Sequence, residues 1–272
     1  MALITRSNEV VSRFCRAPGA LREFRKWQNQ RPPEVVDYVL SHDTRVLYGL
    51  TLDNLVRVLP SRRRPDDHAL GNVNGDQAKV VGSIKNWNPD FAFTHVFHYA
   101  LETMGTFPAW SALRRFFQED ATANAMLWEP SLAMIAKAAK EGWGMQRAQD
   151  AMQWRIGNFY YSFLREVYAV VRLRTEGLEV CAHPLADALF RVDGWCENKV
   201  ISIYVRNPEF RDGQAGRKPD VEVLLKDADP PFTFVPVVLP PASRFAEAHL
   251  PDIVGLRAVV AALRGAEAPG MA

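Results

Sequence analysis

The chain of 272 residues contains only three cysteines, Cys15, Cys181 and Cys196, and no pair has the short spacing of a zinc or redox motif. An odd number of widely spaced thiols predicts reduced cysteines. No apolar run approaches the roughly 20 residues that cross a bilayer. The first residues, MALITRSNEVVSRF, also lack the apolar core of a signal peptide. We therefore expect a soluble, cytoplasmic protein with no membrane partner.

Several motifs of well-known enzyme classes are missing as well. The sequence has no Gly-x-Gly-x-x-Gly segment, no Walker-type loop and no Gly-x-Ser-x-Gly turn. These absences argue against dinucleotide redox chemistry, nucleotide hydrolysis and serine hydrolysis. Net charge is also small, with 33 Lys and Arg against 31 Asp and Glu. Net charge alone therefore does not indicate a nucleic-acid-binding protein.

The charge is unevenly distributed along the chain. Residues 1–64 hold twelve Lys and Arg but six Asp and Glu, and they include the run Arg62-Arg63-Arg64. A basic segment of this kind suits an anionic partner, and it equally suits a well-solvated surface. Both interpretations remain open at this point.

Helical signals dominate residues 1–176. A helix is expected from Asn88-Pro89 to Gly105, and a longer one over residues 145–176, where apolar residues recur at steps of three and four. The stretch 60–80 is rich in Pro, Gly, Asn and Asp and has no period. It predicts a mobile loop or a subdomain boundary.

Short β-branched or aromatic runs follow in residues 177–265, at 188–195, 199–207, 221–226 and 232–239. A final amphipathic helix is expected at 251–264, and residues 266–272 form a tail expected to be disordered. The prediction is an α+β fold. Its helical N-terminal two-thirds packs with a small, mostly antiparallel C-terminal sheet of about four strands and a final helix. No flexible linker lies near residue 177, which favours one closely packed unit.

The most informative segment is a predicted β-hairpin with its turn at Cys196–Lys199. This turn places Trp195 opposite Val200 and Asp193 opposite Ser202, and side chains alternate between the two faces. One face is apolar and belongs to the core: Phe190, Val192, Ile201, Ile203 and Val205. The other face is polar: Arg191, Asp193, Ser202, Tyr204 and Arg206.

Further basic residues follow the hairpin on a Gly-rich loop. Guanidinium and ammonium groups beside a flexible backbone suit phosphate or carboxylate binding. The predicted phosphate-binding residues are Arg191, Arg206, Arg211, Arg217 and Lys218. The alternative is a solvated sheet face with a surface ion pair between Arg191 and Asp193, worth about 0–1 kcal/mol.

A long helix carrying Glu166, followed by a hairpin carrying Asp193, resembles the core of the restriction-endonuclease-like nucleases, the PD-(D/E)xK superfamily, over about residues 150–225. In that family an acid on the helix, an Asp on one strand and an acid-x-Lys on the next hold a divalent metal. The resemblance implies Glu166 and Asp193 as metal ligands, and Mg²⁺ as the cofactor if the protein is an active nuclease.

The sequence departs from this pattern opposite Asp193, where Ser202-Ile203-Tyr204 replaces the acid-x-Lys. The only literal match nearby, Glu197-Asn198-Lys199, lies in the predicted turn. The resemblance then implies a degenerate or weakly catalytic site. A turn shifted to Gly194-Trp195 would instead assemble the catalytic set Glu166, Asp193, Glu197 and Lys199.

The leading hypothesis is an intracellular nucleic-acid-associated protein, binding DNA or RNA through its phosphates. One alternative is a non-enzymatic protein–protein adaptor or complex subunit, and another is an active metal-dependent nuclease. His95, His98 and Glu102 share a helix face that could hold a metal, but their aromatic neighbours favour core histidines. Apart from Mg²⁺ in the nuclease alternative, the sequence predicts no cofactor.

Overall fold

The computed structural model describes residues 3–59, 68–71, 73, 75–205, 220–239, 244–245, 248–251 and 253–265. The chain divides into two compact units. The sheet unit comprises residues 1–52, 165–245 and 249–272, and the helical unit comprises 53–164 and 246–248. The long helix α11 (Met145–Thr175) contributes residues to both.

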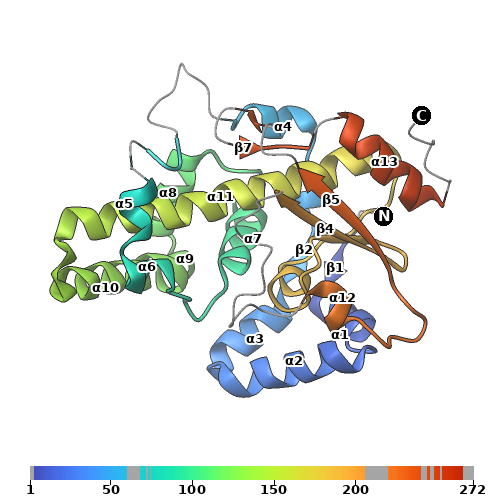
Figure 1. Ribbon diagram of the computed structural model, residues 1–272, viewed down its shortest axis with the longest axis horizontal. Coiled ribbons are helices and arrows are strands. Elements are labelled where there is room, and N and C mark those ends of the chain that lie inside the picture. The colour runs from blue at the N-terminus through green and yellow to red at the C-terminus, as the bar shows by residue number, and fades with distance from the viewer. Residues whose placement is uncertain are drawn as a thin grey trace. The chain divides into compact units, whose positions relative to one another are not determined.

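The sheet unit contains N-terminal helices, a small sheet and a final helix (Figure 1). Its described elements are β1 (Thr5–Arg6), α1 (Ser7–Phe14), α2 (Pro18–Gln30), α3 (Pro33–Ser41), β2 (Asp43–Thr44), a 3₁₀ turn (Val46–Gly49), the end of α11, a π-helical turn (Ala186–Phe190), β3 (Gly194–Cys196), β4 (Lys199–Val205), α12 (Val221–Leu224), β5 (Thr233–Leu239) and α13 (Ile253–Arg264). Two further short strands are β6 (Arg244–Phe245) and β7 (Ala248–His249).

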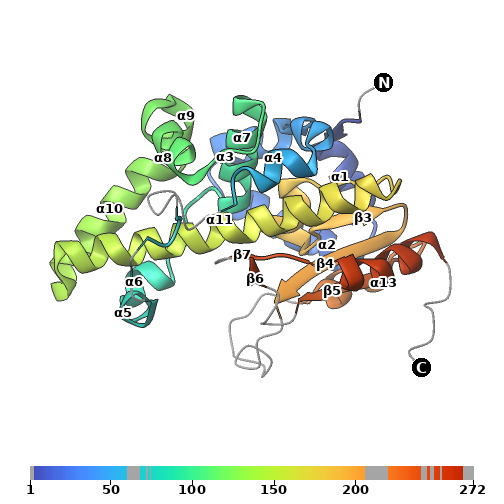
Figure 2. The same ribbon diagram turned by 90° about the horizontal axis from the view of Figure 1, so that it is seen from above.

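The central sheet has the strand order β3-β4-β5. Strands β3 and β4 are antiparallel, whereas β4 and β5 are parallel. A parallel pair needs a long crossover, and the 27 residues between Val205 and Thr233 supply it. Helix α13 packs beside β5 (Figure 2). The α+β prediction is confirmed, although this sheet has three described strands and its longest pairing is parallel.

The hairpin register is confirmed, because Trp195 pairs with Val200. The expected strand over 188–195 is wrong in its first part, since β3 begins only at Gly194. Pro184 opens a helical segment here, and the Nδ1 atom of its neighbour His183 accepts a hydrogen bond from the Leu185 N–H at 3.1 Å. A first-turn proline behind a capping acceptor favours a helix over a strand.

Residues 221–226 were also expected to form a strand, and they form the short helix α12 instead. The Asp220 carboxylate accepts a hydrogen bond from the Val221 N–H at 2.8 Å and caps the helix. Val221 and Leu224 are buried, which is the three-residue spacing of a helix face. The cap and this spacing outweigh the β-branched composition of the run.

The first 52 residues group with the sheet because α1 contributes to its core. Phe14 is fully buried, and its ring meets Trp195 edge-on at 5.3 Å and stacks on Phe232 at 5.5 Å. Gly19 lets α2 approach α12, since a Cβ atom there would lie 2.5 Å from the Leu224 carbonyl oxygen. The division predicted at residue 176 follows the change from helical to β-rich composition. The contacts of the folded chain instead divide it after residue 52 and after residue 164.

The helical unit is built around the first part of α11. Its elements are α4 (Leu52–Val56), α5 (Gly75–Lys79), α6 (Gly82–Lys85), α7 (Phe93–Met104), α8 (Trp110–Glu119), α9 (Ala121–Ala123), α10 (Glu129–Ala138) and the π-helical turns Asn124–Trp128 and Ala139–Trp143. The predicted loop 60–80 lies partly outside the described residues, and α5 occupies part of it. The predicted tail 266–272 lies wholly outside the described residues.

Helix α7 ends where the sequence predicts, because Gly105 adopts a left-handed conformation with φ 70°. It begins at Phe93, four residues after the expected Pro89 start. Aromatic rings fill the space between α7 and α11: Phe97 stacks on Phe163 at 5.6 Å. His95 and His98 lie in this core, 4% and 5% exposed. The described residues contain no group of three His, Cys, Asp or Glu side chains that could hold a metal.

Within the helical unit, Arg155 joins α11 to the end of α6 and the residues that follow it. Its guanidinium donates hydrogen bonds to the carbonyl oxygens of Lys85 and Trp87 and lies over the rings of Phe93 and Phe159. We predict that Arg155→Met lowers the free energy of unfolding by about 2 kcal/mol, because two carbonyls lose a charged donor. Urea unfolding measures the loss, and Arg147→Met, at an exposed position of the same helix, should cost about 0.5 kcal/mol or less.

Among the described residues, no helix is both long enough and apolar enough to span a membrane. Even α11, with 31 residues, contains basic and acidic side chains along its length.

Candidate functional site

The structure describes one of the five residues predicted to bind phosphate. Arg191 is exposed and adopts a left-handed conformation with φ 63°, directly after the π-helical turn Ala186–Phe190. Because Arg191 has this conformation and β3 begins only at Gly194, Arg191 does not lie in a strand and does not take the face predicted for it. The others lie outside the described residues: Arg206, Arg211, Arg217 and Lys218.

Asp193 lies immediately before β3 and continues the hairpin ladder with its side chain. Its N–H donates to the Ile201 carbonyl at 3.1 Å, and its carboxylate accepts a hydrogen bond from the Ile203 N–H. Burial raises the pKa of Asp193 to about 8, and the negative charge of Asp187 adds to this rise. The Ile203 N–H, Arg165 and Arg191 oppose it. Asp193 is therefore a strand-end acceptor with a strong tendency to hold a proton.

The charge of Arg165, on α11, interacts with the charges of both predicted metal ligands. Burial lowers the pKa of Arg165, while the negative charges of Glu166 and Asp193 act to raise it. The structure thus brings Glu166 and Asp193 into the electrostatic surroundings of one buried arginine. In the part of the chain that the structure describes, neither residue belongs to a group of three His, Cys, Asp or Glu side chains that could hold a metal ion.

Glu197 and Lys199 belong to the hairpin turn and its edge. Glu197 is exposed in a left-handed conformation with φ 52°. The Lys199 ammonium donates to the Leu263 carbonyl oxygen at 2.5 Å, near the end of α13. Strand alternation puts Lys199 on the face opposite that of Val200 and its partner Trp195. The shifted turn at Gly194-Trp195 is therefore wrong, and the hairpin does not assemble the four-residue catalytic set.

A polar groove of about 700 Å³ lies between α1 and the hairpin, within the sheet unit. We call it the α1 groove. One side is a single face of α1 and the residues next to it, because positions three and four apart share a helix face. The hairpin turn contributes the other side. Its polar lining includes Asn8, Glu9, Ser12, Arg13, Arg16 and Asn198.

Two arginines of the α1 groove are held by the hairpin turn. The Arg13 Nη1 atom donates to the Glu197 carbonyl at 2.8 Å, and the Arg16 Nη2 atom donates to the Asn198 side-chain oxygen at 3.0 Å. The Arg16 guanidinium also lies 4.1 Å from the centre of the Phe232 ring. Burial, and then the positive charge of Arg13, lower the pKa of Arg16. Both side chains are therefore fixed, and their like charges are close together.

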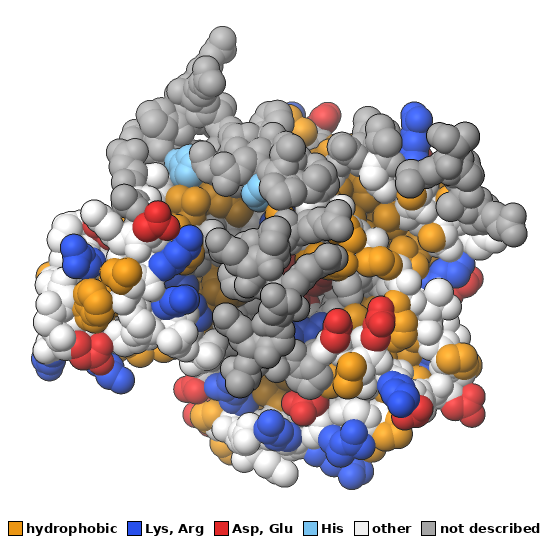
Figure 3. All heavy atoms as spheres, in the orientation of Figure 1, with side chains coloured by type: hydrophobic (Ala, Val, Ile, Leu, Met, Phe, Trp, Pro, Cys, Tyr) orange, Lys and Arg blue, Asp and Glu red, His pale blue; other side chains and the backbone are white. Residues whose placement is uncertain are grey.

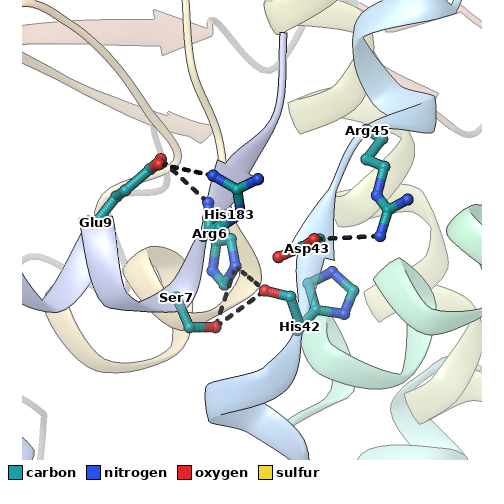
Figure 4. Close-up of polar contacts among 7 residues, drawn as sticks. All are labelled: Arg6, Ser7, Glu9, His42, Asp43, Arg45 and His183. Atoms are coloured by element: carbon teal, nitrogen blue, oxygen red, sulfur yellow. Dashed lines mark hydrogen bonds and ion pairs between the residues drawn. The ribbon is translucent and has the colours of Figure 1, made fainter. Parts of the chain in front are cut away.

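A buried polar cluster joins α1 to the segment that precedes the π-helical turn (Figure 4). Ser7 donates to the Val39 carbonyl at 2.7 Å, and the His183 Nε2 atom lies 3.2 Å from the His42 carbonyl. Because His183 Nδ1 accepts from the Leu185 N–H, Nε2 must carry the proton and donate to that carbonyl. Nε2 therefore cannot act as a base toward Ser7, 3.4 Å away. This cluster is structural, not a hydrolase dyad.

Sequence reasoning missed the α1 groove and the role of Arg165. The only local signal for the groove was the polar spacing of Asn8, Ser12 and Arg16 after Ser7. That spacing is equally typical of any solvated helix face. The groove depends on packing between residues about 180 positions apart, such as Arg16 and Asn198, which no local pattern reveals.

The comparisons with known proteins identify no relative of this chain. No protein-family model matches the chain, and no curated protein or solved structure matches it. The resemblance to restriction-endonuclease-like nucleases therefore stays a prediction from the sequence.

Proposed function

We propose that the protein is nucleic-acid-associated and binds phosphates through the sheet unit, with a restriction-endonuclease-like sheet that is degenerate as a nuclease. The observation that carries this proposal is the charge of the first two helices. Residues 3–30 contain six Lys and Arg but only two Asp and Glu. An unbalanced basic surface attracts the phosphate backbone whatever the base sequence.

Helix α2 presents this charge outward. Arg22, Arg25 and Lys26 are exposed, and their spacing of three and four residues places them on one side of the helix. Figure 3 shows Lys and Arg side chains along the lower edge of the molecule, where Figure 1 places α2. The phosphate contacts proposed for Arg206, Arg211, Arg217 and Lys218 rest on the sequence alone.

The surroundings of Asp193 favour binding over metal-dependent cleavage. Mg²⁺ needs ionised oxygen ligands, whereas burial favours the protonated form of Asp193. Arg165 already lies in the electrostatic surroundings of Glu166 and Asp193. These features support a degenerate site at this position. An active nuclease would instead show Mg²⁺-dependent cleavage that Asp193→Ala abolishes.

A salt titration tests the proposal. We expect a labelled oligonucleotide to bind with an affinity that falls steeply between about 50 and about 200 mM salt, because neutralised phosphates release counterions. Removing two exposed charges with Arg22→Gln/Arg25→Gln should weaken binding and lower the slope of log K against log salt by about 2. Arg217→Ala/Lys218→Ala should act in the same direction. Fluorescence anisotropy measures both quantities.

The matched control is Arg114→Gln/Arg115→Gln, which removes two exposed arginines from α8 in the helical unit. It should leave the affinity and the salt slope close to wild type. Equal losses of affinity in the α2 and α8 variants would show that binding depends on net charge alone. That result would contradict a specific binding surface on α2. Absence of binding at the lower salt concentration would exclude nucleic acid as the partner.

A further inference from the structure

The α1 groove combines fixed positive charge with an unfilled donor. The Arg16 Nε atom is buried and has no hydrogen-bond acceptor among the described residues. Its Nη2 atom is already used by Asn198, so the guanidinium is held in place while one donor lacks an acceptor.

The charge near Arg16 is also unbalanced. In the described part of the chain, no carboxylate forms an ion pair with Arg13 or Arg16. Asp229 attracts Arg16 at longer range, whereas Arg13 repels it. Glu9, the acid in the groove lining, forms an ion pair with Arg6 at 3.6 Å. The end of the groove at Arg13 and Arg16 therefore carries two guanidiniums that a dianion would neutralise.

The rest of the groove suits a hydroxylated molecule. A volume of about 700 Å³ exceeds what a phosphate ion fills and lies in the range of small-molecule sites. Glu9 and Asn8 offer acceptors for hydroxyl groups, and Ser12 offers a donor and an acceptor. Leu3 and Ile4 add a small apolar surface at the same site.

We propose that the α1 groove is a binding site for a phosphate monoester on a hydroxylated carrier. Arg13 and Arg16 bind the phosphate, and Asn8, Glu9 and Ser12 contact the hydroxyl groups. A small sugar phosphate and the terminal nucleotide of a 5′-phosphorylated nucleic acid share this chemistry. The α2 residues Arg22, Arg25 and Lys26 do not line this groove, and the proposal does not depend on nucleic-acid binding at them.

Isothermal titration calorimetry with ribose 5-phosphate, and with ribose as the unphosphorylated match, tests the site on the full chain. Ribose 5-phosphate is expected to bind and ribose is not. Arg16→Gln should weaken binding by about tenfold or more, because it removes a charged donor. Arg257→Gln, at an exposed position of α13 that does not line the groove, should bind as the wild type does.

A second variant separates binding from folding, because Arg16 also contacts the hairpin. Ser12 is exposed at the groove and makes none of the hydrogen bonds that hold the turn. Ser12→Phe should fill the groove and abolish binding while leaving the melting temperature near wild type. Wild-type affinity in Ser12→Phe would overturn the proposal. So would the absence of heat with the wild-type protein at about 10 mM ribose 5-phosphate.

Competition then identifies the carrier. Displacement of ribose 5-phosphate by a 5′-phosphorylated oligonucleotide, but not by its 5′-hydroxyl form, assigns the site to a nucleic-acid end. Lack of displacement by both assigns it to a free small molecule, and either result supports phosphate recognition in the groove. Equal displacement by both forms would contradict recognition of a monoester. If Arg22→Gln/Arg25→Gln left the salt dependence of oligonucleotide binding unchanged while ribose 5-phosphate still bound in the groove, only the proposed nucleic-acid function would be rejected.

Discussion

Lowering the pH from about 7 to about 4 is expected to destabilise the protein by several kcal/mol through His42 and His183. Burial lowers the pKa of His183 to about 3 and the pKa of His42 to about 4. The rings meet edge-on at 5.3 Å, and a charge on His42 further lowers the pKa of His183. Asp43 opposes the fall for His42, and Arg45 adds to it.

The sign follows from the protons bound in each state. The unfolded histidines take up protons near their ordinary pKa of about 6.5, while the folded cluster stays neutral until the pH is far lower. Stability is therefore full above about pH 6.5 and falls as the pH drops toward the folded pKa values. For each histidine the loss at pH 4 is on the order of 3 kcal/mol.

His183→Asn is the variant that tests this. The Asn side-chain oxygen can still accept from the Leu185 N–H, so the cap behind Pro184 survives. The variant loses the Nε2 donor to the His42 carbonyl and should be less stable at pH 7 by about 1–3 kcal/mol. The further loss on acidification should shrink by about half. Urea unfolding at several pH values measures both.

Ser7→Ala is the matched control, because it removes a hydrogen bond to the His42 carbonyl, the acceptor that His183 also uses, without removing an ionisable group. It should lower stability at every pH and leave the pH slope unchanged. If His183→Asn kept the wild-type slope between about pH 6.5 and 4, the histidine cluster would not be the source of acid sensitivity.

Sequence reasoning succeeded for features that depend on neighbouring residues and was less successful for features that depend on residues far apart in the chain. Gly105 and Gly177 mark helix ends by their backbone conformation, a local property, and both are left-handed at those ends. The hairpin register was likewise predictable, because a short turn determines which residues lie opposite each other. Residues 188–193 failed because a capping side chain and Pro184 mattered more than β-branched composition.

The candidate sites were less predictable because they depend on distant segments. Ser7 approaches His183 across 176 positions, and Arg13 reaches Glu197 across 184. The parallel pairing of β4 with β5 also joins segments that have no turn between them to signal it. Asp193 was identified from the sequence as important. Only packing showed that the charges of Asp187 and Arg165 act on it together with that of Arg191.

Asp193→Asn is expected to stabilise the protein at alkaline pH. The pKa of Asp193 in the folded state, about 8, lies above its ordinary value because burial disfavours the charged form. The folded state therefore holds the proton to higher pH than the unfolded chain does. The stability linked to this proton is full below about pH 4 and is lost as the pH rises toward 8.

An asparagine is the neutral isostere for this position. Its side-chain oxygen can accept from the Ile203 N–H as the carboxylate does, and it never ionises. Near pH 4 the variant and the wild type should unfold at similar urea concentrations. Near pH 9 the variant should be more stable by several kcal/mol, because only the wild type then buries a charge. Arg165 and Arg191 reduce this difference without reversing it.

The same variant separates a degenerate site from a working metal centre. A metal ligand at Asp193 must be ionised, so bound Mg²⁺ would lower its pKa and stabilise the folded wild type. We expect about 10 mM Mg²⁺ to leave the unfolding midpoint of the wild type unchanged at pH 7. A midpoint that rises with Mg²⁺ in the wild type but not in Asp193→Asn would show a metal site, and the degenerate interpretation would then be wrong.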